Sequence, residues 1–178
     1  MSKKRRLALI AIAAATFIVT YSFGAETQMS ENDAEKLKKE FAEQVKDMDA
    51  IGIFLNNFRI AATMFIPALG VVVGLVSAYS TGMVFNAITQ TTPQLADLSP
   101  LIILATPFGV MEVFSYGLAM SQSGILINAI AHKRSLRPML KPTLTQLGIV
   151  AAVLLVGAFI EFYMIKTFEP ELETIQTI

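Results

Sequence analysis

The stretch ATPFGVMEVFSYG, residues 105–117, places a helix breaker and a carboxylate inside an otherwise apolar part of the chain. It belongs to the segment Leu101–Ala131, 31 residues whose only charged side chain is Glu112. This segment is longer than the roughly 20 apolar residues that a transmembrane helix needs. The fold therefore depends on whether the segment forms one helix or is interrupted at Pro107.

The charged residues of the chain are segregated along the sequence. Hydrophobic residues make up 54% of the 178 residues and charged residues only 16%. Most charges fall in three blocks, residues 3–6, 26–59 and 132–141. Nearly uncharged runs separated by charged loops are typical of a polytopic helical membrane protein, so we predict an all-α membrane bundle. Because the formal net charge is zero, we expect no nucleic acid partner.

The N-terminus combines a basic start with an apolar segment. Four Lys and Arg residues at 3–6 precede 17 uncharged residues. Ser22 and Gly24 also fit the small residues of a signal peptidase site before Ala25. We expect residues 1–25 to be retained as a signal anchor, with the N-terminus in the cytoplasm.

Residues 26–50 are polar and predict an amphipathic helix outside the membrane. Its apolar stripe follows helical spacing and consists of Ala34, Leu37, Phe41, Val45 and Met48. Asn32 followed by Glu35 resembles a capping box at its start. The helix either binds a partner or the membrane surface, or packs on its own membrane domain, and we favour the second.

The segment Ile60–Tyr79 has 20 residues without a charge and predicts a full span, kinked at Pro67. Gly70 and Gly74 are spaced four residues apart, which allows close helix approach. This approach serves either a dimer or packing within the chain, and we favour packing within the chain.

The charges of the loops constrain the topology. With a cytoplasmic N-terminus, residues 26–59 lie outside and the next span returns the chain to the cytoplasm. The basic loop 132–141 also belongs in the cytoplasm, so residues 83–131 must cross twice or fail to cross fully. A break at Pro107–Gly109 would allow this, because the residue before proline avoids the α region and proline suits a first helical turn.

We therefore predict about five spans with a broken helix or helical hairpin at Pro107–Gly109. A long helix would run from about Phe108 to Ala131, and the last span would be Leu147–Ile165. Residues 51–165 would form the helical membrane domain and residues 166–178 an external acidic tail. The expected location is the cell membrane, with the bilayer itself as the first partner.

Three polar side chains, Asn86, Glu112 and Glu161, fall where hydrocarbon would reject them. At a helix that starts at Pro107, Glu112 could meet unpaired backbone N–H groups and cap its own helix. Alternatively, Glu112 and Glu161 form an ion or substrate site. We favour the structural role for Glu112.

Motifs for catalysis and cofactor binding are missing from the sequence. It has no phosphate-binding glycine loop, no His-Glu zinc pair and no nucleophile elbow. The absence of Cys and the single His132 exclude thiolate and His-rich metal sites. We expect no enzyme activity of this chain alone, no metal and no cofactor.

The order of several short motifs resembles the stage II sporulation protein M (SpoIIM-like) family of integral membrane proteins. The motifs are FLNNFR at 54–59, TPFGVMEVFSYGLAMSQSG at 106–124 and LLVGAFIEFY at 154–163, with Gly82 and Asn86 between the first two. The resemblance covers roughly residues 50–165. Its polar and small positions fall on Asn56 or Asn57, Asn86, Pro107, Gly109, Glu112, Gly124 and Glu161. With Gly70 and Gly74, Gly124 is expected to support helix packing.

Two positions depart from the family pattern. Phe108 stands where the family usually has His, and Ala87 replaces a Gly after Asn86. If that His carries a proton or a metal in relatives, this chain has lost the ability.

The resemblance implies about five spans and a scaffold that recruits other proteins, as its namesake does in spore formers; a sporulation role is not carried over. We therefore expect a non-catalytic membrane scaffold or accessory subunit that assembles with other membrane proteins. A small subunit of a larger membrane enzyme complex, such as an oxidoreductase, is one form of this. The alternative is a small ion or solute channel or transporter that uses Glu112 and Glu161.

Overall fold

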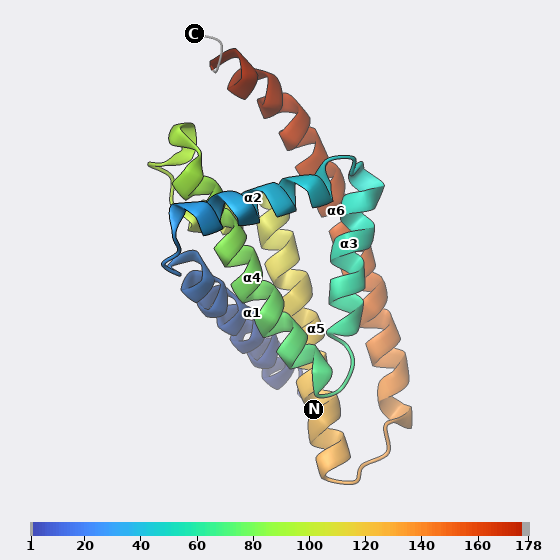
Figure 1. Ribbon diagram of the computed structural model, residues 1–178. Coiled ribbons are helices and arrows are strands. Elements are labelled where there is room, and N and C mark those ends of the chain that lie inside the picture. Colours follow the sequence, from blue (N-terminus) through green and yellow to red (C-terminus); the bar gives the residue numbers. More distant parts are fainter. Residues whose placement is uncertain (1, 176–178) are drawn as a thin grey trace.

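The computed structural model describes the backbone of residues 2–175 and the side chains of residues 2–167. This part of the chain is helical throughout and contains no strand (Figure 1). The elements in chain order are α1 (Lys3–Ala25), α2 (Glu31–Val45), α3 (Ala50–Thr63), α4 (Leu69–Thr91), the 3-10 helices η1 (Pro93–Leu95) and η2 (Pro100–Ala105), α5 (Pro107–Ala131) and α6 (Arg137–Ile175). The predicted all-α class is confirmed.

Within the described residues, four helices are long and apolar enough to cross a membrane: α1, α4, α5 and α6 as far as Thr167. The 14 residues of α3 span about 21 Å, which is short of the roughly 30 Å of a hydrocarbon core. The protein is therefore a helical membrane bundle of four full-length helices, with α3 as a shorter fifth.

Helix α5 is the centre of the bundle. In its most apolar 18-residue stretch 67% of the residues are buried, against 22% in each of α1, α4 and α6. The ring of Tyr116 on α5 packs against that of Phe17 on α1, with 5.3 Å between centroids. Of these four helices, the one that contains Pro107 and Glu112 is therefore the most buried.

The break at Pro107 is confirmed, and the side chain that stabilises it is Thr106. Thr106 has an extended backbone, and its Oγ1 accepts a hydrogen bond from the Gly109 N–H at 3.1 Å. Pro107 fills the first helical position, where its missing N–H removes no helical hydrogen bond. A Cβ at Gly109 would overlap the carbonyl of Ile103 in η2, so glycine allows η2 to fold back against the start of α5.

The prediction of one kinked span over Ile60–Tyr79 is wrong. Helix α3 ends at Thr63 and α4 begins at Leu69, and the two run in opposite directions (Figure 1). The turn between them has Ala68 at φ 67°, and the Leu69 N–H donates to the carbonyl of Pro67 at 2.9 Å. Pro67 has no N–H to bond to the carbonyl of Thr63, four residues earlier, and its ring crowds that carbonyl, so α3 cannot continue.

The turn between α3 and α4 is held against the central helix. The Ser123 hydroxyl on α5 donates to the carbonyl of Ile66 at 2.9 Å, and Met64 and Phe65 are buried. Proline therefore reverses the chain instead of bending one helix. The bundle helix added by this reversal is α3, whereas we expected the extra pass within residues 83–131.

One face of α4 carries small residues at four-residue intervals, all of them buried: Gly70, Gly74, Ala78 and Gly82. A Cβ at Gly82 would overlap the carbonyl of Tyr21, and one at Gly24 would overlap the carbonyl of Tyr79. The backbones of α1 and α4 are therefore in direct contact, as small residues permit in membrane helices.

Gly70 and Gly74 also lie in close contacts within the chain, against the backbone of Met64 and the side chain of Met120. Gly124 differs, because a Cβ there would meet nothing within 4 Å. Contrary to the expectation, Gly124 is not a close-packing position in this fold.

The two ends of the bundle carry different segments. Arg6 near the start of α1 lies 3.5 Å from Gln122, so the N-terminus shares one end with the connection between α5 and α6. At the other end, Tyr21 donates to the carbonyl of Pro100 and α2 runs across the bundle (Figure 1). Helix α6 also ends there, and it continues through Ile175 into the predicted tail. Residues 176–178 of that tail lie outside the described residues.

Candidate functional site

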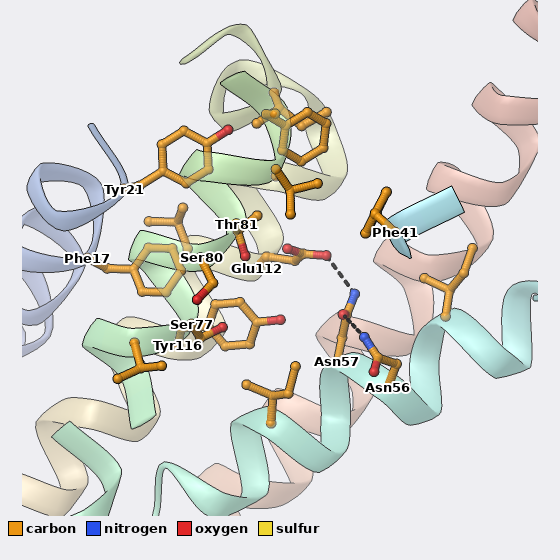
Figure 2. Close-up of a pocket in the computed structure, with 18 of the residues that line it drawn as sticks. Phe17, Tyr21, Phe41, Asn56, Asn57, Ser77, Ser80, Thr81, Glu112 and Tyr116 are labelled. Atoms are coloured by element: carbon orange, nitrogen blue, oxygen red, sulfur yellow. Dashed lines mark hydrogen bonds between the residues drawn. The ribbon is translucent and has the colours of Figure 1, made fainter. Parts of the chain in front are cut away.

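A cavity of about 530 Å³ lies between α3 and α4 and is referred to as the α3–α4 cleft (Figure 2). Helix α5 lies behind it, and Phe41, Val45 and Met48 cover it from α2 and the turn that follows. The cleft is open at its rim, where Val72 and Val76 of α4 are exposed. The polar side chains that line it come from six helices and include one cation, Arg59 of α3: Tyr21, Gln44, Asn56, Asn57, Arg59, Ser77, Ser80, Thr81, Glu112, Tyr116 and Glu161.

The shortest polar contact in the cleft joins α3 to α5. The Asn57 amide donates from Nδ2 to Oε1 of Glu112 at 2.7 Å, and the Asn56 amide donates to Oδ1 of Asn57 at 3.3 Å. A carboxyl group at membrane depth is costly unless it is paired, so this bond stabilises Glu112. It also fixes the short helix α3 against the central helix.

Glu112 therefore has a different structural role from the one predicted. It lies five residues after Pro107, beyond the first turn, and the N-cap of α5 is Thr106. The sequence contained the signal, because a Thr directly before a Pro at a helix start is a recognised N-cap pattern.

Glu161 of α6 lines the same cleft as Glu112, as the alternative of a paired site required. Among the described residues, Glu161 Oε2 is buried and has no hydrogen-bond partner. Glu161 Oε2 is therefore a buried acceptor beside the cleft, and it has no donor within this part of the chain. Together the carboxyl, amide and hydroxyl oxygens can receive a cation or a donating side chain.

The described residues contain no group of three or more His, Cys, Asp or Glu side chains placed to hold a metal ion. The two carboxyl groups and the neighbouring amides offer only oxygen ligands, which are the ligands that hard cations prefer.

The hydroxyl groups of α4 were missed as site residues. Ser77, Ser80 and Thr81 are spaced three and four residues apart, so they share one face of the helix, and all three line the cleft. This spacing was readable in the sequence. It was overlooked because hydroxyl groups in apolar spans often bond to their own helix.

Among the other predicted residues, Gly109 lines the cleft, but Asn86 and Pro107 do not. Asn86 donates to the carbonyl of Thr27 at 2.8 Å and so joins α4 to the segment after α1. Phe108, which stands in place of the family's His, is buried and does not line the cleft. Pro107 and Gly109 shape the start of α5.

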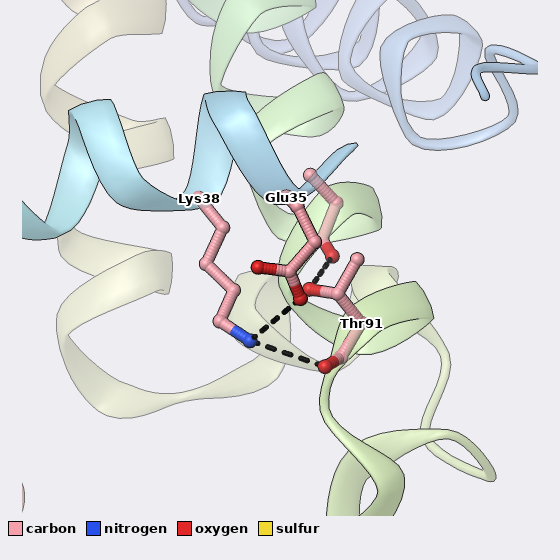
Figure 3. Close-up of polar contacts among 4 residues, drawn as sticks. Glu35, Lys38 and Thr91 are labelled. Carbon is pink, nitrogen blue, oxygen red and sulfur yellow. Dashed lines mark hydrogen bonds and ion pairs between the residues drawn. The ribbon is translucent and has the colours of Figure 1, made fainter. Parts of the chain in front are cut away.

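Helix α2, which covers the cleft, is bonded to the C-terminal end of α4. The Lys38 ammonium of α2 donates to the carbonyl of Thr91 at 3.1 Å and lies 3.6 Å from the carboxylate of Glu35 (Figure 3). A cation at the C-terminal carbonyls of a helix is favourable. Ala34 on the same helix is completely buried, so α2 packs on its own domain, as we favoured.

The start of α2 differs from the capping box expected at Asn32 and Glu35. The N-cap is Ser30, whose hydroxyl accepts a hydrogen bond from the Asp33 N–H at 3.2 Å.

Comparison with known proteins identifies the family. The family model described as stage II sporulation protein M (SpoIIM) matches residues 7–164. Comparisons with curated proteins and with solved structures gave no match. The matched segment runs from α1 into α6 and includes the whole cleft. The chain therefore belongs to the SpoIIM family of membrane proteins.

Proposed function

We propose that this protein is a non-catalytic scaffold or accessory subunit of a membrane protein complex, and that the α3–α4 cleft receives a transmembrane helix of another subunit. The observation that carries the proposal is the polarity of an open cleft. Ser80 is exposed at its side, and Asn57, Glu112 and Glu161 lie within it.

Hydrocarbon tails cannot form hydrogen bonds, so lipid in this cleft would leave its polar groups unsatisfied. A helix with small or polar side chains would satisfy them, since hydroxyl and amide groups form hydrogen bonds between membrane helices. Beside the exposed Arg59, the rim carries apolar side chains where a second helix can pack: Val72 and Val76 on α4 and Ile60 on α3.

The test is site-specific crosslinking from single Cys variants. Because the sequence contains no Cys, each crosslink reports the introduced position alone. Val76→Cys lies at the cleft, and Val19→Cys is its control on α1, because the native side chains are 60% and 54% exposed. In native membranes, we expect a crosslink from residue 76, but not from residue 19, to a second membrane protein identified by mass spectrometry. Equal products from both positions, or none from residue 76, would contradict the proposal.

A second candidate function is binding and passage of a small cationic ion or solute. It is favoured by the unpartnered Oε2 of Glu161 in the same cavity as Glu112. Purified protein in liposomes would then take up a cation, such as Na⁺, K⁺ or methylammonium. Glu161→Gln would abolish uptake, whereas Glu43→Gln on the exposed face of α2 would not. No uptake by the unmodified protein, or uptake that survives Glu161→Gln, would exclude this function.

For the orientation, we propose that the end with the N-terminus and the α5–α6 connection lies in the cytoplasm and that α2 and the C-terminus lie outside. The support is the Lys and Arg content of residues 3–6 and 132–141, because cytoplasmic segments next to spans are enriched in these residues. The proposed location is the cell membrane.

A further inference from the structure

A second cavity lies at the opposite end of the bundle, on the outer surface where α1 and α6 flank α5. It has a volume of about 490 Å³ and is called the α1–α6 groove. The residues that line it are Arg6, Phe114, Leu118, Lys141, Pro142, Thr145, Gln146 and Ile149. None of them belongs to the α3–α4 cleft.

The groove has a charged end and an apolar wall. Arg6 and Lys141 supply two cationic groups, and the wall consists of Phe114, Leu118 and Ile149. The distance along α6 from Lys141 to Ile149 is about 12 Å, from eight residues at 1.5 Å each. Phe114 and Ile149 are 44% and 45% exposed, so this wall faces the surroundings of the bundle.

One oxygen atom of a buried polar side chain on the groove wall has no hydrogen-bond donor among the described residues. Gln146 is 5% exposed and its Nε2 donates to Gln122 Oε1 at 2.9 Å, but its Oε1 has no hydrogen-bond partner among the described residues. An amide flip would set this oxygen against Gln122 Oε1, which already accepts from Arg6. The unpaired group is therefore an acceptor oxygen, buried behind the wall of the groove.

The cations of the groove remain available for a ligand. One Arg6 donor reaches Gln122 Oε1 at 3.5 Å, and the other guanidinium donors are left to bind an anion. Lys141 is exposed. Lys133, Arg134 and Arg137 lie at the same end of the bundle, but none of them lines the groove.

We propose that the α1–α6 groove binds an anionic phospholipid, such as phosphatidylglycerol. The phosphate lies between Arg6 and Lys141, and one acyl chain lies along Phe114, Leu118 and Ile149. Basic pockets between membrane helices bind anionic headgroups in this way.

The test uses the full-length protein in detergent, with retained lipid measured by native mass spectrometry after addition of dioleoyl phosphatidylglycerol or dioleoyl phosphatidylcholine. We expect one phosphatidylglycerol to stay bound where phosphatidylcholine does not. The double variant Arg6→Gln, Lys141→Gln should bind it about tenfold more weakly or worse, because each cation near a headgroup contributes favourably. The charge-matched control Lys133→Gln, Arg134→Gln should bind it as the unmodified protein does.

A further variant and a competitor separate the lipid from its headgroup. Ile149→Trp fills the apolar wall, leaves both cations in place and should also lose the lipid. Soluble glycerol 3-phosphate should not displace it. Equal loss in the control double variant, equal retention of phosphatidylcholine, full binding by Ile149→Trp, or displacement by glycerol 3-phosphate would each overturn the proposal.

Discussion

At the scale of single residues, the bond between Asn57 and Glu112 links the shortest helix of the bundle to its central helix. The 2.7 Å distance and the membrane depth of both groups make this contact the main polar link between α3 and α5. Without this bond, the Glu112 carboxyl group would have one hydrogen-bond donor fewer in a low-dielectric site.

Replacing Asn57 by Leu should lower the free energy of unfolding by about 1–2 kcal/mol, because Glu112 loses its donor while the apolar volume is kept. Denaturant unfolding in detergent, followed by circular dichroism, measures the change. The matched control is Asn56→Leu, which removes only the 3.3 Å bond to Asn57 and should cost clearly less. If the two variants were equally stable, the Asn57–Glu112 bond would not be what fixes α3.

Gly82 should not tolerate a side chain. Gly82→Ala would press a methyl group onto the carbonyl of Tyr21 and should cost about 1–3 kcal/mol through separation of α1 from α4. Gly148→Ala is the control, because a Cβ there meets nothing within 4 Å, and it should be neutral or slightly stabilising. Thermal unfolding of both proteins in the same detergent compares them directly, and a Gly82→Ala protein as stable as Gly148→Ala would disprove the close contact.

Single residues also show what the sequence could and could not reveal. Pro107 was interpreted correctly because its effect is local: the missing N–H and the restricted preceding residue act on any chain. The partner of Glu112 was not predictable, because Asn57 is 55 residues away and only the α3–α4 reversal brings it near. The packing of Gly70 and Gly74 could be anticipated, whereas the open surroundings of Gly124 depend on which helices pack beside it.

At the scale of elements, the start of α5 and the reversal between α3 and α4 decide the path of the chain. Both involve a proline and both pack on other helices: the start of α5 contacts η2 through Gly109, and the reversal contacts α5 through Ser123 and the carbonyl of Ile66. A sequence cannot distinguish a kink from a reversal at Pro67, because the distinction comes from tertiary contacts.

Thr106→Val should shorten or fray the start of α5 and cost about 1 kcal/mol, because the Gly109 N–H loses its acceptor. Thr92→Val is the matched control, since Thr92 precedes η1 without a side-chain capping bond. Amide hydrogen exchange at residues 108–111 should accelerate in the first variant only. Unchanged exchange at these residues would show that Thr106 does not cap the helix.

At the scale of the whole molecule, α1, α3, α4, α5 and α6 pass through the bundle in alternating directions, and the two basic segments share one end. The number of passes is close to expectation, because the charges of two loops decide whether the chain crosses an odd or an even number of times between them. The positions of the passes differ from expectation, because α3 is too short for its length to identify it as a span.

Single Cys variants test this topology. Ser2→Cys and Ser135→Cys should react with a membrane-impermeant thiol reagent only after the cytoplasmic side is opened, and Asn32→Cys and Asp97→Cys should react in intact cells. Because the chain has no Cys, each signal reports one position. Labelling of Ser135→Cys and Asn32→Cys from the same side would contradict the proposed orientation and the five alternating passes.

The most direct test of the proposed role as a membrane subunit is purification in mild detergent with a blocked cleft. Val76→Trp fills the α3–α4 cleft, and Val19→Trp adds the same side chain to a similarly exposed position on α1. The account predicts that the unmodified protein and Val19→Trp co-purify with the same membrane protein in a fixed ratio, and that Val76→Trp is folded but purifies without it. Equal recovery of that protein with both variants, or a chain that always purifies alone, would contradict the account.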